Sequence, residues 1–106
     1  MRRRRRGRRG RLPIQPEIST IPEARKMIPE PSSEGEQIFL DAAEFEAIKL
    51  VDYDGMYQEQ AGQIMGVSRG TIWRFLQSGR SKIVQSILEA RPLVLRVDEE
   101  SDNLQE

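Results

Sequence analysis

The chain has 106 residues, a formal net charge of zero, and neither cysteine nor histidine. The absence of cysteine excludes disulfides and thiolate metal sites, and the absence of histidine removes the commonest general base and metal ligand. No apolar run approaches the roughly 18 residues of a membrane span, and no apolar segment follows the arginine-rich start as in a secretory signal. We therefore expect one small domain in a cytoplasmic protein, with no metal or other cofactor and no membrane association.

The zero net charge hides a strong segregation of charge along the chain. Residues 1–11 carry eight arginines and no acid, whereas residues 12–106 hold all 17 acids and the other nine bases. Residues 66–96, here called the basic zone, have six basic residues against Glu89 alone. Residues 98–106 have five acids and no base. The pattern indicates a basic arm, a basic zone and an acidic tail.

The N-terminal region divides into two segments, and neither predicts a long helix. Residues 1–11 are of low complexity and repel one another, so we expect a disordered arm. Residues 12–37 hold five of the six prolines, which predicts extended or irregular chain with room for a short edge strand. The domain is expected to occupy residues 38–97, and residues 98–106 are expected to form a disordered tail.

The stretch IFLDAAEFEAIKLVDYDG, residues 38–55, contains the first predicted helix. Asp41 is a good N-cap, and Glu44 completes a start that resembles a capping box. Gly55 ends the helix because glycine tolerates a left-handed conformation. The residues expected to face inward, at helical spacing, are Phe45, Ile48 and either Leu50 or Val51.

Two further helices are predicted on either side of a short turn. The second helix covers YQEQAGQIM, residues 57–65, with Ala61, Ile64 and Met65 facing inward. Ser68 is a suitable N-cap for the third helix, which should run to about Ala90 before the Arg91-Pro92 stop signal. The inward stripe of the third helix is predicted to be Ile72, Phe75 or Leu76, Ile83 and Ile87. LVLRV, residues 93–97, predicts a short C-terminal strand.

The second and third helices match the spacing of a helix-turn-helix unit. Gly62 is the small residue where the helices cross, Gly66 takes the positive φ of the turn, and Val67 fills the core behind it. Ile72 and Phe75 are the later core positions. Such geometry also occurs in plain helical domains, but the +5 charge of the basic zone favours a nucleic-acid ligand.

Burial of Ile72 and Phe75 turns the opposite face of the third helix outward. The N-terminal residues of such a helix meet base edges in the major groove, where arginine reads guanine and glutamine reads adenine. The residues predicted to read bases are Arg69, Trp73, Arg74 and Gln77. The residues predicted to bind phosphates are Ser68, Thr71, Arg80 and Lys82. For Trp73, packing against the N-terminal segment or a dimer partner is an equal alternative.

Several short stretches carry a family resemblance. The most specific are EAIKL at 46–50, QE at 58–59, MGVSR at 65–69, Thr71, Arg74 and RSKI at 80–83. In order and spacing, the region from about Phe39 to Leu88 resembles domain-of-unknown-function family 134, small prokaryotic proteins predicted to bind DNA. That family in turn resembles the sigma-factor region that reads the −35 promoter element, which implies a long recognition helix after the turn. Members often carry cysteines near the N-terminus, and this chain has none.

Together these patterns predict a mainly α fold, a three-helix helix-turn-helix domain similar to sigma region 4, with an extended N-terminal segment and a short C-terminal strand. The predicted function is sequence-specific binding of double-stranded DNA by a transcriptional regulator. The arm is expected to track phosphates or enter a minor groove irrespective of sequence. Its arginines are Arg2, Arg3, Arg4, Arg5, Arg6, Arg8, Arg9 and Arg11.

The main alternative is a protein-interaction adapter, for example on RNA polymerase, with loose nucleic-acid contact through the arm. An enzyme is not expected, because the chain has no histidine, no cysteine and no GxxxxGK phosphate loop. Glu44 and Glu46 should also point to different sides of a helix whose carboxylates are expected to be exposed, so they do not converge.

A homodimer would suit a helix-turn-helix reader, because two-fold dimers bind paired half-sites. One predicted route is strand addition through residues 93–97. The other is a second apolar stripe on the third helix, formed by Leu76, Val84 and Leu88.

Overall fold

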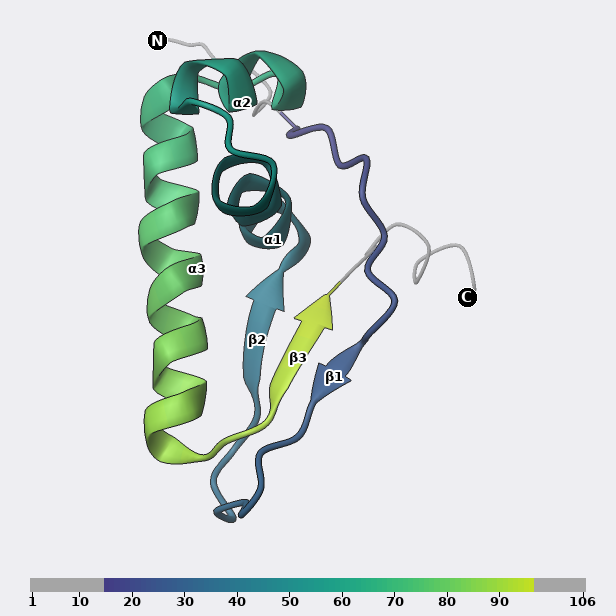
Figure 1. The fold of residues 1–106 in the computed structure, drawn as a ribbon, viewed down its shortest axis with the longest axis vertical. Coiled ribbons are helices and arrows are strands. Elements are labelled where there is room, and N and C mark those ends of the chain that lie inside the picture. Colours follow the sequence, from purple (N-terminus) through teal and green to yellow (C-terminus); the bar gives the residue numbers. More distant parts are fainter. Residues whose placement is uncertain (1–14, 97–106) are drawn as a thin grey trace, which may run out of the picture.

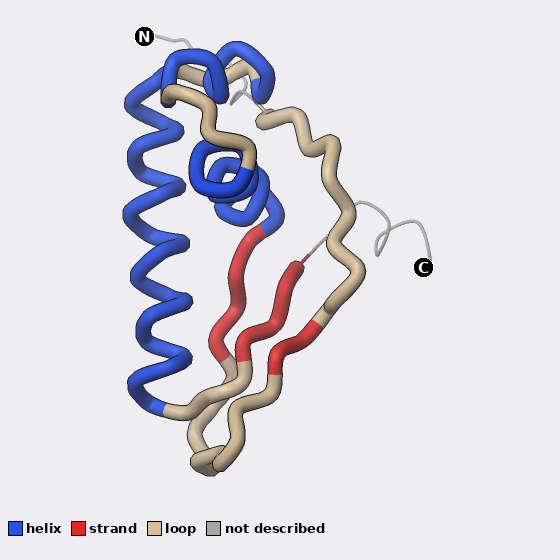
Figure 2. Tube along the Cα trace, viewed as in Figure 1, coloured by secondary structure: helices blue, strands red, loops and turns tan. Residues whose placement is uncertain are grey.

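The computed structural model describes residues 15–96, so the predicted arm and the predicted acidic tail lie outside the described residues (Figure 1). In chain order the elements are β1 (Lys26–Met27), β2 (Ile38–Asp41), α1 (Ala42–Ile48), the π-helical turn η1 (Lys49–Tyr53), α2 (Gln58–Met65), α3 (Arg69–Glu89) and β3 (Leu93–Arg96). The longest helix, α3, runs the length of the molecule. Beside it lie α2 at its N-terminal end, α1 at its middle and the sheet at its C-terminal half (Figure 2). No helix of this described part is long and apolar enough to cross a membrane.

The structure has a three-stranded sheet where the sequence predicts a short C-terminal strand and room for a short edge strand among the prolines. β3 is the middle strand, parallel to β2 and antiparallel to β1, and β1 is the short edge strand allowed for among the prolines. In β2, Ile38 and Leu40 are buried while Phe39 and Asp41 are exposed, the alternation of a half-buried strand. Because β3 already pairs on both sides, strand addition through it is wrong as a route to a dimer.

The first helical segment starts and ends where the sequence predicts. The backbone N–H of Asp41 donates to Glu44 Oε1 at 2.9 Å, which is the backward half of a capping box. The helix continues through η1 and ends before Gly55, whose φ of 79° lies in the left-handed region.

The connection between α2 and α3 also follows the predicted spacing. Gly62 is buried, and a Cβ added to it would lie 2.7 Å from the backbone oxygen of Val67, so a larger residue would prevent this crossing. Gly66 has a φ of 72° in the turn. Ser68 Oγ then accepts a hydrogen bond from the N–H of Thr71 at 3.0 Å, which confirms the predicted N-cap.

Two apolar clusters form the core. The larger cluster joins the helices and consists of Ala47, Leu50, Ala61, Met65, Ile72 and Leu76. The smaller cluster lies beneath the sheet and consists of Ile38, Leu40 and Leu93, with Phe45, Ile83 and Leu95 packed against it. Gly79 lets α1 approach α3 closely, since a Cβ there would lie 2.7 Å from Ile48 Cδ1.

Two residues predicted to face inward are exposed. Ile64 is 43% exposed and Ile87 is 74% exposed, so both predictions are wrong. Leu76, rather than Phe75, is the fully buried partner of Ile72, and Phe75 packs at the edge of the larger cluster. The reason is helical phase: the buried stripe of α3 follows steps of three and four residues through positions 72, 76, 79, 83 and 86, and position 87 falls beside it. Leu76 therefore cannot belong to an exposed dimer stripe.

Candidate nucleic-acid interface

The N-terminal half of α3 presents a polar face to solvent. Burial of Ile72 and Leu76 on one side directs the other side outward. That outward side carries the exposed residues Arg69, Gly70, Trp73, Arg74 and Gln77. Trp73 is 52% exposed. All four residues predicted to read bases therefore share one accessible surface, here called the α3 face.

The first turn of α3 is ordered by its own side chains. Besides capping Thr71 N, Ser68 Oγ lies 2.9 Å from Thr71 Oγ1. A guanidinium N–H of Arg74 donates to Thr71 Oγ1 at 3.3 Å. These bonds join two of the predicted phosphate-binding residues to Arg74. The helix N-terminus, with its positive end of the macrodipole, lies beside them.

The other two predicted phosphate-binding residues are held in internal ion pairs. Arg80 donates two hydrogen bonds to the Asp52 carboxylate, at 2.8 and 3.1 Å. These hydrogen bonds raise the pKa of the Arg80 guanidinium. Lys82 Nζ lies 2.9 Å from Glu44 Oε1. Both cations thus share their charge with an acid of α1 or η1, a pairing that helical spacing alone does not reveal.

Glu44 corrects the expectation of exposed carboxylates. Its side chain is 7% exposed and accepts hydrogen bonds from Lys82 Nζ, Ser78 Oγ and the N–H of Asp41. Burial alone would raise the pKa of Glu44, but the hydrogen bonds from Lys82, Ser78 and Asp41 outweigh it and lower the pKa below its ordinary value. Glu44 is therefore a structural carboxylate that joins α1 to α3.

Glu46 is also buried, with no exposed surface. Its Oε2 accepts a hydrogen bond from Ser19 Oγ at 2.8 Å, and its Oε1 accepts one from the N–H of Thr20 at 3.0 Å. The expectation that this carboxylate is exposed is wrong, because the N-terminal segment covers it. Nothing in the sequence pattern of that proline-rich segment pointed to this contact.

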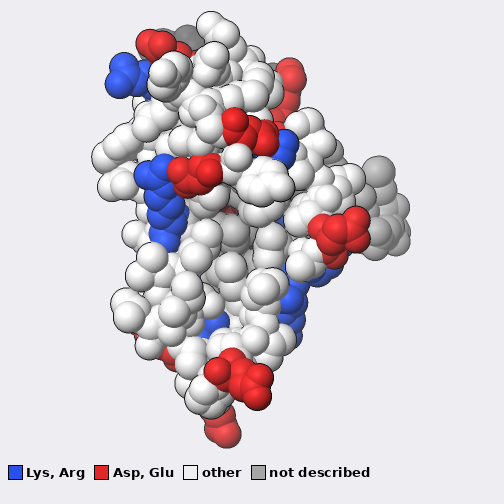
Figure 3. Space-filling view, in the orientation of Figure 1, with Lys and Arg blue, Asp and Glu red and all other residues white. Residues whose placement is uncertain are grey.

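Arg69 and Arg74 differ from the other basic residues of α3 in their ion pairing. Within residues 15–96 neither forms an ion pair, whereas Arg80 and Lys82 do. On the face of the molecule in Figure 3, basic and acidic side chains lie intermixed rather than in one broad basic patch. The available positive charge on α3 is thus concentrated in its first two turns. The same described range contains no cluster of three or more carboxylates that could hold a metal ion.

Comparison with known proteins identifies the family. The model described as "Protein of unknown function DUF134" matches residues 1–102. The chain belongs to the DUF134 family. This confirms the resemblance read from residues 39–88.

The chain is similar to proteins of archaea and bacteria that are named "UPF0251 protein". The chain is 57% identical to one from Thermococcus kodakarensis over 58 residues, which are 55% of this chain and 51% of the relative. It is 46% identical to one from Pyrococcus furiosus over 93 residues, covering 85% and 83% of the two chains. It is 39% identical to one from Aeromonas salmonicida over 69 residues, covering 65% and 68%. No solved structure matches the chain.

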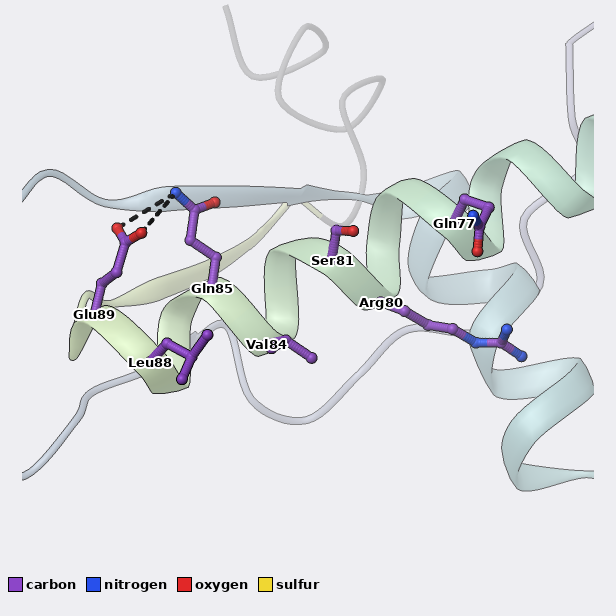
Figure 4. A pocket seen from close by; sticks show the side chains of 7 residues that line it. All are labelled: Gln77, Arg80, Ser81, Val84, Gln85, Leu88 and Glu89. Atoms are coloured by element: carbon purple, nitrogen blue, oxygen red, sulfur yellow. Dashed lines mark hydrogen bonds between the residues drawn. The ribbon is translucent and has the colours of Figure 1, made fainter.

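The C-terminal half of α3 gives this DUF134 member a second exposed surface. A shallow hollow of about 410 Å³ lies along it (Figure 4). The residues that line it are Gln77, Arg80, Ser81, Val84, Gln85, Leu88 and Glu89. Val84 is 52% exposed and Leu88 78% exposed. Together with Ile87 they form the apolar stripe of α3, which differs from the predicted stripe in containing Ile87 in place of Leu76.

Proposed function

We propose that the protein is a sequence-specific DNA-binding protein and a transcriptional regulator. In this proposal α2 and α3 form a helix-turn-helix unit related to sigma region 4, and α3 is the recognition helix. Its N-terminal half enters the major groove, with Arg69, Arg74 and Gln77 at base edges. Ser68 and Thr71 meet phosphates beside the helix N-terminus, where backbone N–H groups and the macrodipole favour an anion.

The observation that carries the proposal is the uneven pairing of cations along α3. Arg80 and Lys82 are engaged with Asp52 and Glu44, but Arg69 and Arg74 are exposed and without an acidic partner in the described chain. Arg69 and Arg74 are five residues apart, or about 1.4 turns of the helix. Each guanidinium group, exposed near the start of a helix, suits the two acceptors that guanine presents in the major groove. Arg80 and Lys82 then contribute less to DNA affinity than Arg69 and Arg74, because each shares its charge with an acid.

Binding to random-sequence duplex DNA tests this order of importance. The main measurement is the affinity at several salt concentrations, since each phosphate contact adds about 0.9 to the slope of log affinity against log salt. The double variant Arg69→Ala/Arg74→Ala should bind at least tenfold more weakly than the natural chain, and Arg80→Ala serves as the matched control with little effect. Equal affinity of the double variant and the natural chain would contradict the proposal.

Selection of bound sequences from a random duplex pool tests sequence specificity separately. The proposal expects a consensus site, with a preference at one or two guanines that is lost in Arg74→Ala. Each base-specific contact of this kind contributes about 1–3 kcal/mol of discrimination. If the selected sequences remain random after several rounds, the protein binds DNA without sequence specificity and this part of the proposal is wrong.

The exposed side chain of Trp73 favours a second candidate, the protein-interaction adapter. Tryptophan is enriched at the centres of protein interfaces, and here it lies half exposed on the α3 face. An adapter, for example on RNA polymerase, would use Trp73 to bind protein and the arginine-rich arm for loose nucleic-acid contact. Loss of duplex binding on removal of the arm charges, but not in Arg69→Ala/Arg74→Ala, would favour this candidate.

The apolar stripe of α3 favours a homodimer as the DNA-binding form. Val84, Ile87 and Leu88 are 52%, 74% and 78% exposed and lie close together on α3. Neighbouring exposed apolar side chains often mark an interaction surface. Pairing of two copies through this stripe would bury all three side chains. The paired recognition helices would then read two half-sites related by two-fold symmetry.

A further inference from the structure

Three side chains at the start of α3 form one continuous set of hydrogen bonds. Ser68 Oγ accepts a hydrogen bond from the backbone N–H of Thr71 at 3.0 Å, and the two hydroxyl oxygens lie 2.9 Å apart. Thr71 Oγ1 also accepts a hydrogen bond from Nη2 of Arg74 at 3.3 Å. The N-cap of α3 and the guanidinium of Arg74 are thus connected through one threonine hydroxyl.

The hydroxyl oxygen of Thr71 is a rigid acceptor. The backbone N–H and the hydroxyl of Thr71 are both bonded to Ser68. Threonine is branched at Cβ, so its χ1 angle has few allowed values in a helix. Whichever of the two hydroxyls donates to the other, Thr71 Oγ1 keeps a lone pair for Arg74. The acceptor that meets the guanidinium is therefore fixed by the cap itself.

The bond to Thr71 sets the direction of the Arg74 side chain. Thr71 and Arg74 are three residues apart, so they are neighbours on the surface of the helix. Thr71 is nearly one turn closer to the helix N-terminus, and the bond holds the guanidinium over that first turn. In the proposed function this is the part of α3 that enters the major groove.

A guanidinium held in this way still has the donors that guanine requires. Arginine has five N–H groups, and the bond to Thr71 uses one of them. Reading guanine takes two parallel hydrogen bonds, to O6 and N7. Fixing the side chain beforehand also reduces the rotamer freedom that is lost on binding. Within residues 15–96 Arg74 forms no ion pair that would have to break first.

We infer that Thr71 is a positioning residue, which orients Arg74 to read one guanine in the major groove. The inference rests on the proposed function and gives Thr71 a part in sequence preference besides its contact with phosphate. One hydroxyl proton lies between the oxygens of Ser68 and Thr71, so the two residues together keep one O–H for a phosphate. The sequence preference at that guanine then depends on a hydroxyl that touches no base.

The test compares the affinities of one protein for two duplexes. The first is the duplex recovered by selection from the random pool, and the second has A·T in place of one G·C pair of the consensus. The ratio of the two dissociation constants is here called the guanine preference. For the natural chain it should be about 5- to 150-fold at one position. The fraction of folded protein cancels in this ratio, so a purely structural change does not alter it.

Three variants of threonine isolate the hydroxyl. Thr71→Val keeps the branched shape and the backbone N–H that Ser68 accepts, and it should lower the guanine preference about two- to tenfold, as for one lost hydrogen bond. Thr71→Ser keeps the hydroxyl and should restore most of the preference. The matched control is Thr20→Val in the N-terminal segment, where the bond to Glu46 comes from the backbone N–H. It should leave the guanine preference unchanged.

The outcomes separate the inference from the proposed function. If Arg74→Ala abolishes the guanine preference but Thr71→Val keeps it in full, the inference is overturned and the proposed function stands. The inference is likewise overturned if Thr71→Ser loses as much preference as Thr71→Val, or if Thr71→Val acts at a guanine that Arg74→Ala does not affect. If selection yields no consensus, or the preference survives in Arg74→Ala, the proposed reading by Arg74 fails and the inference fails with it.

Discussion

The Nζ atom of Lys82 on α3 lies 2.9 Å from Oε1 of Glu44 on α1, whose side chain is 7% exposed. The two helices pack closely beside this ion pair, since a Cβ added to Gly79 would lie 3.2 Å from Glu44 Cβ. Lys82, which the sequence predicts to bind phosphate, is thus engaged in holding α3 against α1.

Replacing Lys82 with methionine should lower the free energy of unfolding. The methionine keeps the apolar stem but removes the ammonium, so a nearly buried carboxylate loses its charged partner. Because Lys82 is itself partly exposed, we expect a loss of about 1–3 kcal/mol, below the range for wholly buried pairs. Urea denaturation measures it. The control Arg80→Met breaks a pair whose side chains are nearly half exposed and should cost at most about 1 kcal/mol; equal losses would contradict the assignment.

The depressed pKa of Glu44 predicts an acid dependence of stability. Its pKa is lowered in the folded protein because the hydrogen bonds from Lys82, Ser78 and Asp41 outweigh burial. The contribution is therefore fully present above the ordinary glutamate pKa of about 4.3 and is lost as the pH falls through the lower, folded-state pKa.

The difference in stability between the natural chain and Lys82→Met should accordingly narrow as the pH is lowered below about 4. Unfolding by urea at a series of pH values measures this difference. Arg80→Met provides the comparison, because its difference from the natural chain does not depend on Glu44. If the difference in unfolding free energy between the natural chain and Lys82→Met stays constant down to about pH 3, the stabilisation does not depend on the charge of Glu44 and the prediction is wrong.

Gly62 and Gly70 should respond oppositely to alanine. At Gly62 the new Cβ would lie 2.7 Å from the Val67 oxygen, a backbone atom that cannot move without opening the turn. We expect a cost of about 1–3 kcal/mol, as for overpacking in a core. A Cβ added at Gly70 would lie 3.9 Å from its nearest neighbour, the Oγ of Ser68. Alanine there should therefore leave the folded state unchanged in stability or stabilise it by up to about 1 kcal/mol through helix propensity.

Thermal unfolding distinguishes the two alanine variants, since 1 kcal/mol shifts the Tm of a domain of this size by about 4–8 °C. Gly62→Ala should melt several degrees lower than the natural chain and Gly70→Ala at the same temperature or higher. Similar melting of both variants would mean that α2 and α3 do not cross closely at Gly62.

Much of the helical part of the fold could be predicted because its signals are local. Gly66 and Ser68 specify the turn and the cap through their own backbone and side chain, so the bounds of α2 and α3 follow from a few positions. β2 was missed for a related reason: it covers only four residues, and its alternation at Ile38 and Leu40 is cut short by the N-cap of α1. The sequence predicts β3, but its place in the middle of a sheet depends on partners that lie 55 residues earlier in β2 and 66 to 68 residues earlier in β1.

In the candidate site too, local features could be predicted from the sequence and contacts between distant segments could not. The exposure of Arg69 and Arg74 follows from the burial of the opposite side of one helix, which helical periodicity predicts. The pairing of Lys82 with Glu44 and the covering of Glu46 by Ser19 join elements that are far apart in sequence. Spacing within a single helix contains no information on such contacts, so the sequence assigned these charged residues to the surface.

The apolar stripe of α3 gives the last prediction. If two copies pair through it, Ile87→Ser/Leu88→Ser should weaken the dimer by well over tenfold, because burying each of these side chains contributes about 1.5–3 kcal/mol. Sedimentation equilibrium over a range of protein concentrations measures the dimer dissociation constant. The control is Ile21→Ser, which changes an apolar residue of similar exposure, 68%, in the N-terminal segment. It should leave the dimer dissociation constant unchanged. A natural chain that is monomeric at every concentration, or equal weakening by both variants, would remove α3 as the dimer surface.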